Sequence, residues 1–183
     1  MSTGIRAFLA LFVLLVAGVA PALARPLTEA ETTALADKVA EFDAAMRSND
    51  YETIIEVIPP RVLQHIADGA GAPTDELKVA LIGQMKEIFA SVTMLSFGMD
   101  VAAAEHRELT DGSPYVLLPT TTVMEAEGLG KMKVDSFTLG LLDEADWYLV
   151  RVSDVAMVGV LRQVYPEFTA VEFPAETMTA LED

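Results

Sequence analysis

Few side chains in this sequence have the chemistry for acid–base catalysis. The chain contains two histidines, His65 and His106. Imidazole titrates near neutral pH, so His65 facing a cavity would serve as a general base. A surface position near a helix C-terminus, which the helix dipole favours for histidine, explains His65 as well. His106 stands between Glu105 and Arg107, which is typical of a solvated strand end. Neither histidine has the H-x-H or H-E-x-x-H spacing of metal ligands, so we expect no metal site.

Two carboxylates lie within segments that we expect to be strands, Asp100 and Asp135. An acid buried in an apolar cavity has a raised pKa and can abstract a proton next to a carbonyl group, with Tyr115 as a possible hydrogen-bond donor. Side chains alternate along a strand, so Lys133 shares a face with Asp135, and this indicates an exposed ion pair at least as readily as a catalytic role. The catalytic candidates are therefore His65, Asp100 and Asp135.

A different set of residues could hold a ligand without reacting with it. Arg151 inside a cavity would bind a carboxylate through two hydrogen bonds, although it could equally pair with one of the 28 acidic residues. Trp147 and Tyr148 point to opposite faces of their strand, so we expect one of them in the core. The candidate ligand-binding residues are Tyr115, Trp147 and Arg151. The nine methionines fill core gaps or line an adaptable apolar pocket.

Composition excludes several classes of function. The 183 residues include 12 basic and 28 acidic ones, and the formal net charge of −16 argues against binding to nucleic acid. The absence of cysteine excludes disulfides, thiolate catalysis and iron–sulfur clusters. The sequence has no G-x-S-x-G, G-x-G-x-x-G or P-loop motif, so we expect no cofactor.

The N-terminus has the pattern of a secretory signal peptide. Arg6 precedes the apolar run 7–20, and Ala22-Leu23-Ala24 forms an A-x-A cleavage site. The run is shorter than the roughly 20 residues that a membrane-spanning helix needs. We therefore expect cleavage after Ala24, no membrane anchor afterwards, and a bacterial periplasmic or secreted protein. The remainder is expected to be one domain over residues 25–165, followed by a loose acidic tail over residues 166–183.

The first half of this domain is predicted to be helical. Thr28 and Glu31 form a capping box, and an apolar stripe follows as far as Ser48. A second helix begins after Asn49-Asp50 and is interrupted at Pro59-Pro60, with a further turn over residues 62–66. After a loop, a third long helix is expected to have Thr74 as its cap. Its inward residues would be Leu77, Leu81, Met85, Ile88 and Phe89.

The second half is predicted to form strands over residues 92–108, 115–124, 131–142 and 147–152, before a short helix over residues 155–165. Turn-forming residues separate these strands. Helices followed by antiparallel strands favour an α+β domain, in which a curved sheet of about four strands wraps the three helices.

The segment Ala45-Met46-Arg47-Ser48-Asn49-Asp50-Tyr51, leading through Ile54, Ile58 and Pro59 to His65, resembles the opening of nuclear transport factor 2-like proteins. The strand Trp147-Tyr148-Leu149-Val150-Arg151 is similar to the final strands of that superfamily. The resemblance covers residues 35–154 and implies a cone-like fold. The chain departs from the pattern in its third long helix and its C-terminal helix. The superfamily includes ketosteroid isomerases and dehydratases, as well as non-catalytic domains that bind ligands or partners.

Three functions remain open from the sequence. The first is an exported domain that binds a small apolar or amphipathic ligand in its cone without catalysis. The second is an assembly module that forms a homodimer or binds a partner through the open face of its sheet. The third is a cofactor-free lyase or isomerase that uses His65, Asp100 and Asp135. Fold alone does not choose among them.

Overall fold

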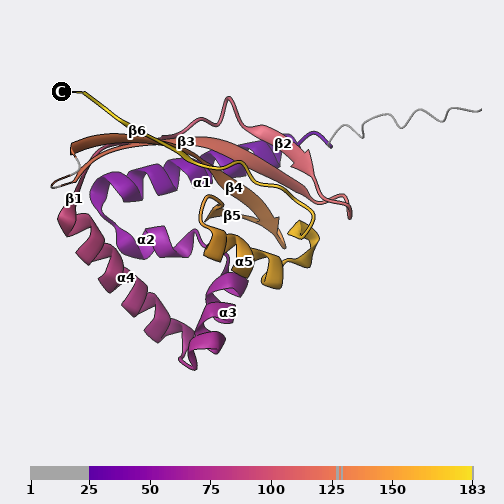
Figure 1. Ribbon diagram of the computed structural model, residues 1–183. Helices are drawn as coiled ribbons and strands as arrows, with labels where there is room; N and C mark the ends of the chain where they lie inside the picture. The colour runs from indigo at the N-terminus through magenta and orange to yellow at the C-terminus, as the bar shows by residue number, and fades with distance from the viewer. Residues whose placement is uncertain (1–24, 127, 129, 183) are drawn as a thin grey trace, which may run out of the picture.

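The computed structural model describes residues 25–126, 128 and 130–182. The expected signal peptide and its cleavage after Ala24 lie outside these residues. The described chain is an α+β fold in which helices come first and a curled, antiparallel half-barrel sheet follows (Figure 1). The predicted order of helices and then strands is therefore confirmed.

Four helices precede the sheet in the described part of the chain, and local signals set their ends. They are α1 (Glu29–Ser48), α2 (Tyr51–Glu56), α3 (Pro60–Ala70) and α4 (Thr74–Ser91). The predicted capping box is present at Thr28 and Glu31. Asn49 ends α1 in the left-handed conformation, with a φ of 56°. Asp50 then caps α2 by accepting a hydrogen bond from the backbone N–H of Thr53.

The sheet contains six strands within the described residues, and four of them form its main path. Its strands are β1 (Val92–Met99), β2 (Glu105–Glu108), β3 (Pro114–Ala126), β4 (Gly130–Asp143), β5 (Asp146–Arg151) and β6 (Thr177–Ala180). They pair antiparallel in the order β1-β3-β4-β5, while β2 also pairs with β3 and β6 with β4. The single extended segment expected over residues 92–108 is thus two strands. The chain turns between them at Asp100, whose backbone N–H donates to the carbonyl oxygen of Pro119 at 2.9 Å.

Helices pack on both faces of the sheet, but part of its outer face, around Lys133 and Asp135, remains exposed. Helix α1 packs on one face, where Leu35 and Val39 meet side chains from β3 and β5. The other face is covered by α3, by α5 (Val155–Val164) and by the short 3-10 helix η1 (Pro166–Phe168). Figure 1 shows α4 descending from β1 to α3, with α2 between α4 and α1. The sequence predicted that the sheet wraps all the N-terminal helices. This is wrong for α3, which contributes to the core on the opposite face of the sheet.

The C-terminal segment is part of the fold, in contrast to the loose tail expected beyond Pro166. Phe168 is buried among core residues, and β6 adds to the edge of β4. Strand β5 pairs only with residues 138–143 of β4 and leaves residues 132–135 without a partner on that side. Backbone groups on a sheet edge need hydrogen-bond partners, and β6 supplies them there.

Helix α4 differs from its prediction at two positions. Thr74 is its first helical residue and not its cap, and the Thr74 hydroxyl donates to Oε1 of Gln64 at 2.8 Å, which ties α4 to α3. Ile88, expected to point inward, is 60% exposed. Among the helices of the described residues, none is both long and apolar enough to cross a membrane.

Candidate functional site

Helix α4 is an 18-residue helix without a single buried side chain. Helical spacing places five apolar residues on one side of it, and these are only half-buried: Leu77, Leu81, Ile82, Met85 and Phe89. Val79 and Ile88 are 71% and 60% exposed. A surface helix ordinarily buries its apolar stripe against the core. The stripe of α4 is thus apolar surface that the protein itself covers incompletely.

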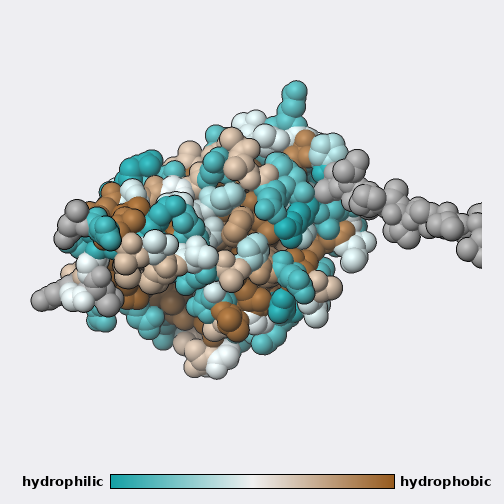
Figure 2. All heavy atoms as spheres, turned by 45° about the horizontal axis from the view of Figure 1, so that its top comes forward, coloured by the Kyte–Doolittle hydropathy of each residue, from teal (hydrophilic) through white to brown (hydrophobic). Residues whose placement is uncertain are grey.

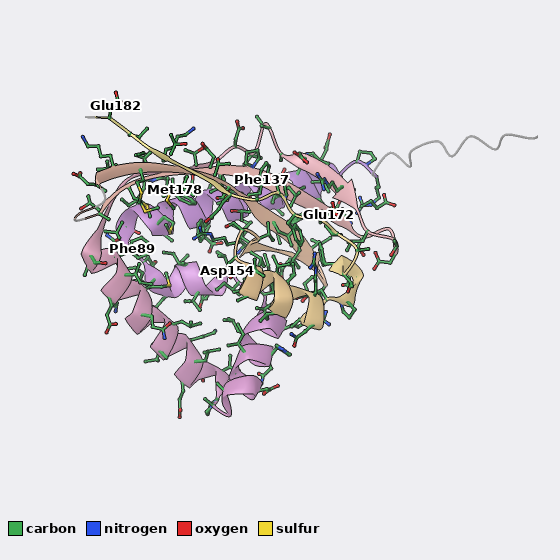
Figure 3. The ribbon with its side chains drawn as sticks, in the orientation of Figure 1. Phe89, Phe137, Asp154, Glu172, Met178 and Glu182 are labelled. Atoms are coloured by element: carbon green, nitrogen blue, oxygen red, sulfur yellow. The ribbon has the colours of Figure 1, made fainter. Side chains whose placement is uncertain are left out.

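A groove of about 410 Å³ opens where α4 ends. It lies between the C-terminal end of α1, the last turn of α4 and strand β1. Its lining residues are Met46, Arg47, Asn49, Phe89, Val92, Thr93, Met94, Leu95, Ser96 and Phe97. Figure 3 labels Phe89 on α4 at this junction. The volume falls within the range of small-molecule sites, about 300–1,000 Å³.

Local structure explains why the groove forms here. The left-handed residue Asn49 ends α1, and the chain turns there into α2. Helix α4 passes into β1 without a loop, which fixes Phe89 relative to the first strand. The pairing of β1 with β3 shifts register between Met94 and Ser96, and the additional residue, Leu95, is 47% exposed. Such a bulge bends an edge strand and redirects its side chains.

Methionines lie side by side on the strands next to the groove. Met94 of β1 is the direct partner of Met124 on β3, which is in turn the partner of Met132 on β4. Cross-strand partners share a face of the sheet, so these three side chains form a row. Met178 of β6 pairs with Val134 and therefore lies on the same face (Figure 3). This methionine row is partly exposed, and methionine adapts to irregular apolar surfaces.

The charge beside the groove is positive in an otherwise acidic protein. Arg47 is the charged residue of the lining, and its side chain is 67% exposed. The nearest carboxylate is that of Asp43, 3.9 Å away. Burial raises the pKa of Asp43, and its Oδ1 is enclosed without a hydrogen-bond partner. On α4, the Lys86 ammonium lies 5.9 Å from the centre of the Tyr51 ring.

The structure does not bring the three catalytic candidates together. His65 is exposed on α3, with Nε2 3.2 Å from Oε1 of Gln163. Asp100 is exposed in the turn after β1, where it accepts a hydrogen bond from the backbone N–H of Ala103 at 3.0 Å. No hydrogen bond, ion pair or shared pocket joins His65, Asp100 and Asp135 within the described residues.

Asp135 has the environment of a surface ion pair. Its carboxylate lies 2.8 Å from Lys133 and accepts a hydrogen bond from the Thr121 hydroxyl at 2.8 Å. These two partners lower the pKa of Asp135. A general base in an apolar cavity needs the opposite shift. The alternative predicted for Asp135, an exposed face with Lys133, is confirmed. In the residues that the structure describes, no three histidine, aspartate or glutamate side chains cluster as metal ligands would.

The three candidate ligand-binding residues lie away from the groove. Tyr115 is buried and packs edge-to-face on Phe168, with ring centres 5.4 Å apart. Trp147 is buried against α1, and its Nε1 donates to the carbonyl oxygen of Glu31 at 3.0 Å. Arg151 pairs with Glu176 at 2.7 Å. Tyr115 and Trp147 are therefore core residues, and Arg151 holds the C-terminal segment.

A second polar cluster joins α3, the turn after β4 and the end of α5. The Tyr165 hydroxyl donates to Oδ2 of Asp143 at 2.7 Å. Arg61 lies over the Tyr165 ring at 4.5 Å and 3.5 Å from Asp143. A cavity of about 250 Å³ adjoins the cluster. Each of the three side chains already has a partner within the cluster, so its role is to hold α5 in place.

Sequence reasoning missed the residues of the groove, although signals for them existed. The break at Asn49 and the abundance of methionine are visible in the sequence, but no local spacing shows that Asn49, Met46 and Met94 meet in one groove. Val79 lies outside the apolar stripe of α4, and an apolar residue there is a sign of a helix that is not fully buried. In comparisons with known proteins, the chain matches no family model, no curated protein and no solved structure.

Proposed function

We propose that this protein is a non-catalytic domain that binds a small apolar or amphipathic ligand in the groove between α1, α4 and β1. The observation that carries this proposal is the half-covered apolar stripe of α4, which leads to Phe89 in the groove wall. Removing apolar surface from water is favourable by roughly 25 cal/mol per Å². A ligand in the groove would cover surface that the protein leaves exposed.

The proposal includes export of this domain through a signal peptide and a relationship to the nuclear transport factor 2-like superfamily. A signal peptide over residues 1–24 would deliver the domain to the periplasm or the exterior of a bacterium. The helices and the curled sheet are compatible with the cone of the nuclear transport factor 2-like proteins. Many members of that superfamily bind ligands without catalysis, and the separation of His65, Asp100 and Asp135 favours this role over a lyase or isomerase.

Assembly through β1 is a second candidate. Strand β1 is an edge of the sheet and contains no charged residue, and charge is one means by which proteins protect such edges from pairing. A homodimer or a partner strand could add there. The outer face of the sheet is less suitable, since Figure 2 shows hydrophilic and hydrophobic residues interspersed over it.

Binding of a neutral fluorescent probe, N-phenyl-1-naphthylamine, tests the first function. We expect the protein to bind the probe, and Met94→Gln, in the groove, to weaken binding by about fivefold, because a polar group replaces apolar contact. The matched control is Val155→Gln, which changes an apolar residue that is 86% exposed on α5.

The proposal fails if the probe does not bind or if the two variants bind it equally. Light scattering on the same samples distinguishes the second function. A dimer that Leu95→Lys dissociates would support assembly through β1, whereas a monomer at all concentrations would exclude a homodimer.

A further inference from the structure

We infer that the groove takes a single-chain amphiphile with an anionic head group, of which a fatty carboxylate is the simplest case. The head group would bind at Arg47, and the chain would lie against Phe89 and Met94. This inference rests on the proposed function and specifies the charge of its ligand.

The first argument is the distribution of ion pairs. With 28 acidic and 12 basic residues, a basic side chain here finds a carboxylate easily. Within the described residues, six basic side chains have a carboxylate oxygen within 3.5 Å: Arg25, Lys38, Arg61, Arg107, Lys133 and Arg151. Arg47 has its nearest at 3.9 Å. Lys78 and Lys86, both on α4, have none within 4.0 Å in the described chain. Arg162, on α5, also has none and donates instead to the carbonyl oxygen of Val171 at 2.8 Å. Arg47, Lys78 and Lys86 therefore lie on α4 or beside the groove without a close counterion, whereas Arg162 is held by a backbone carbonyl.

The second argument is the polarity of the groove itself. Its polar lining consists of Arg47, Asn49, Thr93 and Ser96, and no carboxylate belongs to it. A guanidinium binds a carboxylate or phosphate through two parallel hydrogen bonds. At 3.9 Å, Asp43 lies beyond hydrogen-bond distance of Arg47. An anionic ligand would therefore find the donors of Arg47 available.

The third argument is the direction in which the apolar surface continues. From Phe89, the stripe of α4 runs back through Met85 and Ile82, which are spaced as i, i−4 and i−7 and so share one side of the helix. Residues 78–89 of this helix extend over about 16 Å. On the sheet side, Met94 begins the methionine row. Both surfaces continue from the groove as rows of apolar side chains, and an extended alkyl chain can follow such a row better than a compact ring system.

Three probes with the same twelve-carbon chain test the inference on the full chain after residue 24: dodecanoate, dodecanol and dodecyltrimethylammonium. Each competes with N-phenyl-1-naphthylamine, below its micellar concentration and at low salt. We expect dodecanoate to displace the probe at about tenfold lower concentration than either competitor, because charge-assisted hydrogen bonds add to the same apolar contact.

Substitutions test whether Arg47 causes the preference for dodecanoate. Arg47→Gln is expected to remove the advantage of dodecanoate and leave dodecanol unchanged, and Arg47→Lys to retain part of it. Lys86→Gln should reduce the advantage by about twofold. Lys133→Gln, which removes a cation that pairs with Asp135, is the control and should behave as the unaltered protein.

The possible outcomes separate this inference from the proposed function. If all three probes compete equally, or if dodecyltrimethylammonium competes best, the anionic head group is wrong while the apolar groove stands. If dodecanoate is preferred equally by the unaltered protein and by Arg47→Gln, the placement of the head group is wrong. If neither the fluorescent probe nor any competitor binds, both the inference and the proposed function fail.

Discussion

The Tyr165 hydroxyl shows how a buried polar group holds this fold together. It donates to Asp143 at 2.7 Å, and the Tyr165 ring lies beneath Arg61. The side chains come from the C-cap of α5, from the end of β4 and from α3, so the cluster fastens the C-terminal helix to two other elements. Burial, together with the hydrogen bond to Asp143, raises the pKa of Tyr165 well above its ordinary value.

Replacement of Tyr165 by phenylalanine is expected to destabilise the protein by about 1 kcal/mol at pH 7, since the ring remains and one hydrogen bond is lost. The effect of pH has a definite sign. In the unfolded chain Tyr165 loses its proton near pH 10, its ordinary pKa, while the folded protein retains it. Stability therefore falls as the pH rises above about 10, and Tyr165→Phe lacks this contribution.

Urea unfolding of both proteins between pH 7 and pH 11 measures the difference. The two stabilities should converge as the pH rises above 10. Curves that stay parallel over this range would show that the Tyr165 proton is not coupled to folding.

Sequence patterns did not predict the contacts of the groove or of the Tyr165 cluster, because these contacts join residues that are far apart in the sequence. Arg61 and Tyr165 meet across more than a hundred residues, and nothing in their local sequence specifies this contact. Lys133 and Asp135 are two residues apart on one strand, so their ion pair followed directly from strand alternation. Local spacing predicts contacts within an element, whereas the groove depends on where three elements meet.

At Gly140 of β4, the neighbouring strand β3 and helix α1 both approach the backbone closely. A Cβ atom there would lie 2.6 Å from Cγ2 of Val116 and 3.3 Å from Cδ1 of Leu35. The absence of a side chain therefore allows Leu35 to pack on the strands. Gly83 of α4 is the opposite case, since a Cβ atom there would have nothing within 4 Å.

Alanine at these two glycines is expected to have opposite effects. Gly140→Ala should cost about 1–3 kcal/mol, because the added methyl group forces α1 or Val116 to move. Gly83→Ala should stabilise by about 0.5–1 kcal/mol, because glycine within a helix is unfavourable relative to alanine and space is open. Thermal unfolding of both variants against the unaltered protein gives the comparison. Stabilisation by Gly140→Ala would mean that α1 does not lie this close to β4.

The elements with strong local signals were those that the sequence predicted well. The capping box at Thr28 places the start of α1, Pro59 separates α2 from α3, and an acidic turn divides β4 from β5. The sequence did not predict the ordered tail because β6 is short and all four of its residues are exposed. Its formation depends on a vacant edge of β4, which is a property of the assembled sheet.

The beginning of the expected mature chain is tied to the adjacent helix α1 and to the distant strand β2. The Arg25 guanidinium binds Glu31 at 2.7 and 2.9 Å. This contact and the backbone N–H of Thr28 hold the pKa of Glu31 at about 2. The backbone nitrogen of Arg25 donates to Oε2 of Glu108, on β2, at 2.6 Å. Cleavage after Ala24 would convert this nitrogen into a charged ammonium group, and its hydrogen bond into an ion pair that joins the start of the chain to the sheet.

A protein that starts at Arg25 with a free amino group is therefore expected to melt at a higher temperature than the same chain with an acetylated N-terminus. The difference should shrink in high salt, because exposed charges are screened. Glu108→Gln should abolish it, whereas Glu105→Gln, a neighbouring acid that pairs with Arg107, should leave it unchanged. Differential scanning calorimetry of the six proteins, each of the three sequences with a free and an acetylated terminus, provides the measurement. Equal melting temperatures for the free and acetylated forms of the unaltered sequence would show that a charged terminus at Arg25 adds nothing to the stability of the fold.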